Sequence, residues 1–224
     1  MRKIQQPLRK GIETVTWDMN YMDQRGPSVP PGKYYVSMEK YVNGEYINLD
    51  EEKEFTINAL DNSALGKPDY KAKFEFLKQA SDKYTRISEV YSYASDLKSE
   101  MENLRTELVR TPENTNDLML ETKNIEKKLD DIIYAVSGRR TEGVRIDATE
   151  PSIMNRMRFA VSATSGSEDD ITGAQKEQYG IALARFEQEY VKLEQLYAVE
   201  LVKLKSNLEM VNIDWSPDIL PLFK

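Results

Sequence analysis

The chain has 224 residues with 31 Lys and Arg against 38 Asp and Glu, and this acidic balance argues against nucleic-acid binding, which depends on clustered basic side chains that neutralise phosphates. It contains no Cys and no His, which excludes disulfides, thiolate nucleophiles and metal sites built on either residue, and removes the side chain best suited to proton transfer near neutral pH. We therefore predict that the chain is not an enzyme and uses no cofactor.

The first predicted element is a β-strand at residues 11–19. Apolar and polar side chains alternate there, with Val15, Trp17 and Met19 on one face, and this period is typical of a half-buried strand. We expect Trp17 to be an anchor of the core.

Two turn signals follow the predicted strand. Pro31 and Gly32 fit the central positions of a type II turn, in which glycine supplies the positive φ. Asn43-Gly44 predicts a type I′ hairpin between a strand at 33–42 and a return strand that begins at Glu45. With residues 53–58 this makes three or four strands, too few to cover their own apolar face.

These residues carry a family resemblance. The pattern of Gly11, Trp17-Asp18, Pro31-Gly32-x-Tyr34-x-Val36 and a closing strand such as EFTIN resembles the second half of the immunoglobulin-like fold of flagellar hook-capping proteins. Followed by long helices, it resembles the C-terminal region of large bacterial proteins that carry BNR or Asp-box repeats in a sortilin-like β-propeller. Those proteins are often labelled glycosyl hydrolases on the strength of the propeller.

The resemblance implies a non-catalytic appendage of an exported, surface-associated protein, outside the cytoplasm. Any glycosidase activity would then reside in an upstream propeller, and no catalytic residue is carried over. We expect Trp17 and Tyr34 to pack in a core that residues 1–60 cannot close alone, with the missing strands supplied from before Met1 or by another chain.

The helical part begins with one long helix. Apolar residues spaced by three and four from Tyr70 to Leu108 predict an amphipathic helix that ends near Arg110, ahead of Pro112. Thr111 and Pro112 then fit the N-cap and first turn of a second helix, which should end at Gly138.

A shorter third helix is predicted from Ile153 to Thr164. A capping box of Thr172 and Gln175 then starts another long helix that extends to Val211. Since the second and third helices together match the length of either long one, we expect an up, down, up bundle whose middle leg is broken at 138–149. A four-helix bundle is the alternative.

The predicted fold class is therefore α+β, a small partial immunoglobulin-like antiparallel β-sheet followed by a long antiparallel helical bundle. The predicted divisions are a β domain at 1–60, a linker at 61–67, the bundle at 68–212 and a tail at 213–224. Pro217 and Pro221 prevent the tail from extending the helix. It is expected to pack back on the fold, or alternatively to be a docking peptide with Trp215 and Phe223 as contacts.

Three surface features are candidate sites. The acidic loop 166–171 offers carboxylates to calcium but lacks the EF-hand pattern, and acidic residues before a helix also favour its N-terminus. Tyr41 and Tyr46 flank the hairpin turn and are possible surface contacts. A group of arginines suggests an anion site or, more simply, exposed ion pairs with nearby carboxylates: Arg139, Arg140, Arg145, Arg156 and Arg158.

The predicted function is a structural or docking role within a larger protein, with upstream domains or another protein as partner. No nucleic acid, membrane span or small-molecule substrate is expected. The alternative is an independent helical adaptor or chaperone-like subunit, which would bind a partner by β-strand addition or along its helices.

Overall fold

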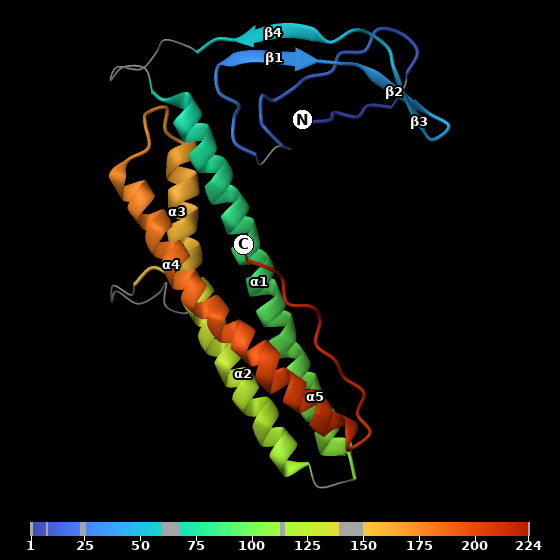
Figure 1. Ribbon diagram of the computed structural model, residues 1–224, viewed down its shortest axis with the longest axis vertical. Helices are drawn as coiled ribbons and strands as arrows, with labels where there is room; N and C mark the ends of the chain where they lie inside the picture. Colours follow the sequence, from blue (N-terminus) through green and yellow to red (C-terminus); the bar gives the residue numbers. More distant parts are fainter. Residues whose placement is uncertain are drawn as a thin grey trace. The chain divides into compact units, whose positions relative to one another are not determined.

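The computed structural model describes residues 2–7, 9–22, 26–59, 68–112, 115–138 and 150–223. The chain divides into two compact units, Met1–Gln79 with Thr164–Ile171, and Ala80–Ala163 with Thr172–Lys224. The first holds two antiparallel sheets of two strands each, and the second is a helical bundle (Figure 1). The α+β fold class is thus confirmed. The predicted linker at 61–67 and Arg139, Arg140 and Arg145 lie outside the described residues.

The β part of the first unit is one long hairpin, here called the ribbon. Its outer pair is β1 (Gly32–Val36) with β4 (Lys53–Ile57), and its inner pair is β2 (Glu39–Val42) with β3 (Glu45–Asn48). Between the pairs, residues 37–38 face residues 49–52, and the Leu49 N–H donates to the Met38 carbonyl at 2.8 Å. Because two residues oppose four, the ladder is interrupted there.

One of the two predicted turns is present. Asn43 and Gly44 have φ values of 51° and 89°, which confirms the type I′ hairpin. The type II turn at Gly32 is wrong, because Gly32 has no positive φ and instead opens β1, opposite Ile57.

The predicted strand at residues 11–19 is also wrong. The Trp17 indole N–H donates to the Asn20 carbonyl at 3.1 Å, the Asp18 carboxylate accepts from the Asn20 N–H at 3.1 Å, and Met19 has a φ of 57°. These contacts turn the chain. Among the described residues of this segment, strand-like pairing is limited to an isolated antiparallel β-bridge between Asn20 and Ser28. Alternation alone does not supply the neighbouring strand that a ladder requires.

The first predicted helix is present as α1 (Tyr70–Arg110), 41 residues long. Its N-terminus is capped by Asp69, whose carboxylate accepts from the Ala72 N–H at 2.9 Å. Its buried seam repeats every three or four residues, apart from one skipped turn between Ala80 and Ile87: Leu77, Ala80, Ile87, Val90, Ala94, Leu97, Met101, Leu104 and Leu108.

The second helix, α2 (Asn116–Ser137), begins later than predicted. Thr111 does not cap it, because its hydroxyl donates back to the Glu107 carbonyl at 3.1 Å. The N-cap is Thr115, whose hydroxyl bonds the Leu108 carbonyl rather than the α2 backbone. The predicted end at Gly138 is confirmed, since Gly138 has a φ of 77° and its N–H donates to Tyr134.

The last two legs also follow the sequence pattern, with one local change. α3 (Ile153–Ser165) precedes α4 (Gly173–Gln195), and both bonds of the Thr172–Gln175 capping box are present. α4 continues through a π-helical segment, η2 (Leu196–Leu201), into α5 (Val202–Glu209). The buried residues Leu196 and Leu201 are five apart, and a π turn absorbs that one-residue excess.

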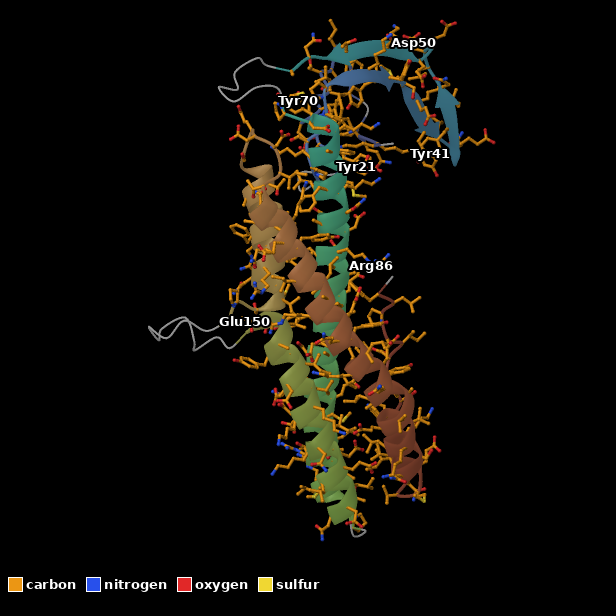
Figure 2. The ribbon with its side chains drawn as sticks, turned by 60° about the vertical axis from the view of Figure 1, so that its left-hand side comes forward. Tyr21, Tyr41, Asp50, Tyr70, Arg86 and Glu150 are labelled. Carbon is orange, nitrogen blue, oxygen red and sulfur yellow. The ribbon has the colours of Figure 1, made fainter. Side chains whose placement is uncertain are left out.

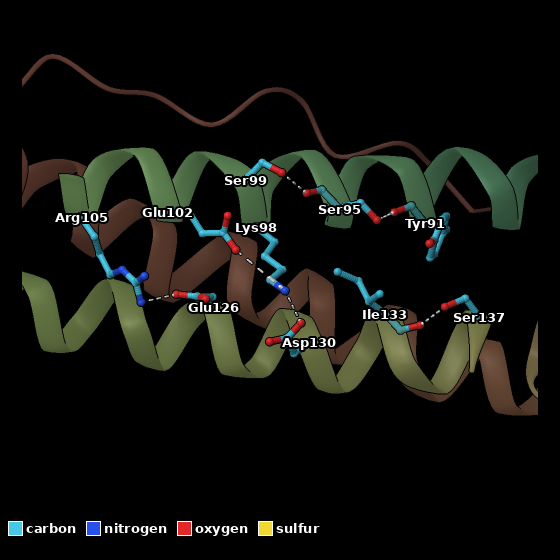
Figure 3. Close-up of polar contacts among 10 residues, drawn as sticks. All are labelled: Tyr91, Ser95, Lys98, Ser99, Glu102, Arg105, Glu126, Asp130, Ile133 and Ser137. Atoms are coloured by element: carbon cyan, nitrogen blue, oxygen red, sulfur yellow. Dashed lines mark hydrogen bonds and ion pairs between the residues drawn. The ribbon is translucent and has the colours of Figure 1, made fainter. Parts of the chain in front are cut away.

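The second unit is an up, down, up bundle. Figure 1 shows α2 and α3 following one another along the middle leg, with the α4–η2–α5 leg returning antiparallel to them. Ion pairs join α1 to α2, Lys98 to Asp130 at 2.7 Å and Arg105 to Glu126 at 2.7 Å (Figure 3). The core itself is a single cluster of apolar side chains drawn from every leg.

The C-terminal segment, residues 213–223, leaves α5 in a fixed direction. Asn212 has a φ of 59°, and the Ile213 N–H donates to the Leu208 carbonyl at 3.0 Å, which together form a Schellman-type end. Trp215, Leu220 and Phe223 then pack against the core of the bundle.

Candidate docking surface

An aromatic cluster lies on one face of the ribbon. Tyr34 on β1 faces Phe55 on β4, with ring centroids 5.9 Å apart. The Trp17 ring lies edge-on to both, at 5.9 Å from Tyr34 and 6.1 Å from Phe55. Edge-to-face geometry of this kind adds about 0.5–1.5 kcal/mol per pair beyond the burial of area. The structure therefore brings the predicted residues Trp17 and Tyr34 together.

Among the described residues this cluster is only partly covered. Between residues 2 and 59 none of the described side chains is fully buried, and Phe55 itself is 37% exposed. Many apolar side chains of this segment are open to solvent: Ile12, Val15, Met19, Met22, Tyr35, Val36, Met38, Val42, Ile47 and Leu49. Where exposed apolar side chains form a contiguous patch, they mark an interaction surface.

The opposite face of the outer pair is polar. Lys33 forms an ion pair with Glu54 at 2.8 Å, and the Tyr35 hydroxyl donates to the same carboxylate at 3.0 Å. These hydrogen bonds, first from Lys33 and then from Tyr35, hold the pKa of Glu54 below its ordinary value. The ribbon thus has one aromatic face and one charged face.

The tip of the ribbon carries a tyrosine pair. Tyr41 and Tyr46 face each other across β2 and β3 with centroids 4.7 Å apart, and they are 63% and 55% exposed. The Lys3 ammonium lies 4.6 Å from the Tyr46 ring centroid, a cation–π contact. Figure 2 shows Tyr41 near the hairpin turn and Asp50 where the ladder is interrupted. The pair predicted as surface contacts is indeed at the surface.

The N-terminal arm, residues 2–7, supports the same segment. Arg2 forms an ion pair with Asp18 and donates to the Asn20 carbonyl at 3.1 Å. Burial raises the pKa of Asp18, but the hydrogen bond from Arg2 and the Asn20 N–H outweigh it, so the pKa lies below its ordinary value. Sequence reasoning missed these roles of Arg2 and Lys3, because isolated basic residues near a terminus carry no spacing signal.

Pro31 and Gly32 lie beside the cluster in a different role from the one predicted. The Tyr34 hydroxyl donates to the Pro30 carbonyl, which fixes the ring over the start of β1. Two hollows of the first unit, of about 350 and 520 Å³, share the lining residues Val29, Pro30, Pro31, Tyr70 and Phe74. Their shared lining is mostly apolar, which extends the apolar character of this unit.

The acidic loop 166–171 serves α1 in this structure. Asp170 accepts a hydrogen bond from the Asp69 N–H at 2.7 Å, and the Ser167 carbonyl accepts from Lys73. Across the described residues no group of three or more carboxylates is arranged to hold a metal ion. The loop therefore has a visible structural use, and the geometry adds nothing in favour of calcium.

The two described arginines of the predicted anion group, Arg156 and Arg158, lie in different environments. Arg158 is exposed, whereas Arg156 is 9% exposed and donates to Glu150 at 2.9 Å and to Gln178. Arg185 shares the same Glu150 oxygen at 2.7 Å, and Figure 2 labels Glu150 just ahead of α3. Among the buried side-chain nitrogen and oxygen atoms of the described residues, the Nε atom of Arg156 is without a hydrogen-bond partner. This cluster ties the middle and last legs of the bundle together.

Trp215 and Phe223 are both engaged by the bundle. The Trp215 indole N–H donates to the Glu100 carboxylate at 3.1 Å. The Phe223 ring lies 4.6 Å from Phe186 and 5.7 Å from Tyr190. These predicted contact residues therefore belong to the second unit, apart from the ribbon surface.

Comparison of the chain with family models, with curated proteins and with solved structures found no match. In the part of the chain that the structure describes, no helix has the length and apolarity needed to cross a membrane.

Proposed function

We propose that this chain is a non-catalytic docking region whose ribbon is completed by β-structure from outside residues 1–224. The observation that carries the proposal is the incompletely buried aromatic face: Trp17 packs against Tyr34 and Phe55 of a two-stranded ribbon in which no described residue is fully buried. A hairpin of two strands is marginally stable alone. A covering layer would add the burial that the ribbon lacks.

Two kinds of contact are available to such a layer. Both strands of the outer pair are edges, since the described strands form pairs only, and each edge presents backbone donors and acceptors to an added strand. The aromatic face offers apolar area at about 25 cal/mol per Å² buried. Strand addition at an edge would set the register, and packing on the Trp17 side would supply most of the free energy.

The larger protein in this proposal is an exported, surface-associated bacterial protein with an upstream β-propeller. Support comes from the resemblance of residues 11–36, of whose signature residues Trp17 and Tyr34 pack against each other. The bundle would act as a spacer, since the 41 residues of α1 extend over roughly 60 Å at the α-helical rise. The missing immunoglobulin-like strands would precede this chain.

Site-specific photo-cross-linking tests the proposal in the cells that make the protein. A benzophenone amino acid replaces Val36, which lies on the same face of β1 as Tyr34, or Phe55, with Val199, an exposed apolar residue of the bundle, as the control. We expect the ribbon positions to cross-link to an extended segment outside 1–224, at every second residue of that segment, because alternate residues of a strand share one face. The control at Val199 should give no such cross-links. Ribbon cross-links confined to residues 1–224 would overturn the proposal.

The same experiment distinguishes a docking region of a larger protein from the alternative, an independent adaptor. If the cross-linked segment belongs to the same polypeptide, the native species is several times heavier than 25.9 kDa and the ribbon completes an upstream domain. If it belongs to a separate polypeptide, the chain is an independent adaptor that acts by strand addition.

A further inference from the structure

The C-terminal segment lies against the bundle as an extended strap without secondary structure of its own. Figure 1 shows it turning back at the end of α5 and running beside α1. Beyond Ile213, none of its described residues is fully buried, and Ile219 and Leu222 are 88% and 65% exposed. The strap therefore lies on the surface of the bundle in the manner of a bound peptide.

The bundle holds the backbone of the strap by hydrogen bonds from two legs. The Tyr93 hydroxyl on α1 donates to the Asp218 carbonyl at 3.0 Å, and the Tyr190 hydroxyl on α4 donates to the Pro221 carbonyl at 2.9 Å. The Phe223 N–H donates back to the Tyr190 oxygen at 3.3 Å. Because every residue carries a backbone carbonyl, these bonds set the path of an extended segment without selecting its side chains.

An aromatic side chain anchors the strap at each end. The Trp215 indole N–H donates to the Glu100 carboxylate at 3.1 Å. The Phe223 ring lies 4.6 Å from the Phe186 ring, and the Lys83 ammonium lies 4.6 Å from the Phe223 ring centroid. Aromatic anchors of this kind dominate the energetics of recognition, so selectivity should come from these two positions and their spacing.

A proline follows or precedes each anchor at the same distance. In the strap sequence WSPDILPLF, Pro217 is the second residue after Trp215 and Pro221 is the second residue before Phe223. Proline fixes φ and favours an extended backbone, which lowers the entropy lost on docking. Extended proline-containing segments that dock on aromatic side chains are a recurring mode of peptide recognition. The strap has the chemistry of such a ligand.

We propose that the surface beneath the strap, here called the strap site, binds an extended proline-containing segment of a different protein, which displaces the strap. The strap site is formed by Tyr93 and Glu100 on α1 and by Phe186 and Tyr190 on α4. Phe186 and Tyr190 are only 1% and 7% exposed beneath the strap, so an empty site would expose aromatic area to water. A segment that repeats the contacts of the strap avoids this cost. The inference does not depend on the docking role proposed for the ribbon.

Titration of the unmodified chain with a synthetic peptide tests the proposal. The probe, WSPSSLPSF, keeps the anchors, the leucine and both prolines of the strap at their spacing, and the control, WSPSSSLPSF, has one more serine between the prolines. Because the tethered strap competes at an effective concentration of about 1 mM, we expect an apparent dissociation constant near that value. Binding should lower the hydrogen-exchange protection of the Phe223 amide, measured by NMR, and leave that of Ile125 in α2 unchanged.

Variants separate the strap from the site beneath it. Trp215→Ala together with Phe223→Ala removes both anchors from the strap, so the probe should bind at least about tenfold more tightly than to the unmodified chain. In that background Tyr190→Phe should weaken probe binding by about fivefold, because it removes a hydrogen bond to the peptide backbone. Tyr134→Phe, on α2, is the matched control and should leave binding unchanged.

Two results would overturn the proposal: no binding of the probe to the unmodified chain at about 10 mM, or equal binding of the control peptide. This titration alone decides the matter if the double variant loses the protection of its Ile125 amide. Sedimentation of the unmodified chain identifies the source of the occupant. A dimer that the double variant abolishes would place the strap of a second copy in the site, and the assignment to a different protein would be wrong.

Discussion

The ribbon and the bundle are built from similar apolar residues but reach very different degrees of burial. The bundle buries a side chain on almost every turn of each leg, whereas the described residues of the β segment, between 2 and 59, include none that is fully buried. The difference lies in the number of layers. Three legs enclose a core between them, while the apolar face of the two outer strands is only partly covered, with Trp17 packed against Tyr34 and Phe55. Amphipathic pattern is therefore necessary for a core but not sufficient.

The sharpest test of this contrast is a cavity in the bundle. Leu129→Ala in α2 removes a side chain that is 0% exposed, so we expect the free energy of unfolding to fall by about 3 kcal/mol in urea denaturation. Leu120→Ala, in the same helix but 60% exposed, should change it by less than about 0.5 kcal/mol. Equal losses would show that α2 is not packed as described.

In the ribbon the corresponding change is Trp17→Ala. It removes two edge-to-face contacts, so we expect the local opening free energy of β1 and β4 to fall by about 1–2 kcal/mol in amide exchange. Bundle amides should keep their protection, and Val15→Ala, an exposed neighbour, should have little effect. A loss that extends to α2 would mean that the two regions unfold together.

Two glycines test backbone freedom in the two regions. Gly44→Ala places a side chain at a φ of 89° and should weaken the hairpin by about 1 kcal/mol, seen as lower protection in β2 and β3. Gly180→Ala lies inside α4 with nothing near its added methyl, and should instead raise the unfolding free energy by about 0.5–1 kcal/mol. Effects of the same sign would contradict the assignments.

The smallest effect concerns the ion pair between α1 and α2. A double-mutant cycle of Lys98→Ala and Asp130→Ala should give a coupling of about 0.2–1 kcal/mol, because both side chains are partly solvated. Hydrogen bonding to Asp130 raises the pKa of Lys98 above its ordinary value, so the ammonium stays protonated at neutral pH. The coupling should decrease at high salt, and one that is insensitive to salt would indicate a buried pair.

Helices were more predictable than strands for a physical reason. The seam of α1 and the capping box of Thr172 and Gln175 each depend on residues close in sequence, so spacing alone reveals them. The segment at 11–19 has the alternation of a strand but lacks a partner, and sequence spacing does not report a missing partner. The type I′ turn at Asn43-Gly44 was predictable because a two-residue turn also depends only on neighbouring residues.

The candidate surface was predictable only in part. Alternation indicates Trp17, the position of the hairpin turn indicates Tyr41 and Tyr46, and the family resemblance indicates Tyr34. The contacts of Lys3 with Tyr46 and of Trp215 with Glu100 join residues that are far apart in the chain, and neither residue type is unusual where it stands. Such contacts emerge only from the fold.

The π-helical segment Leu196–Leu201 has a consequence for how this chain tolerates changes in length. A regular α-helix that loses one residue rotates everything beyond it by about 100°, which turns a buried seam toward solvent. Here the five-residue step from Leu196 to Leu201 already holds one residue in excess. Removal of one residue between them would leave a regular four-residue step, with Leu204 and Leu208 still facing the core. In the last leg of the bundle, this is the place where a single-residue deletion straightens the helix instead of unpacking it.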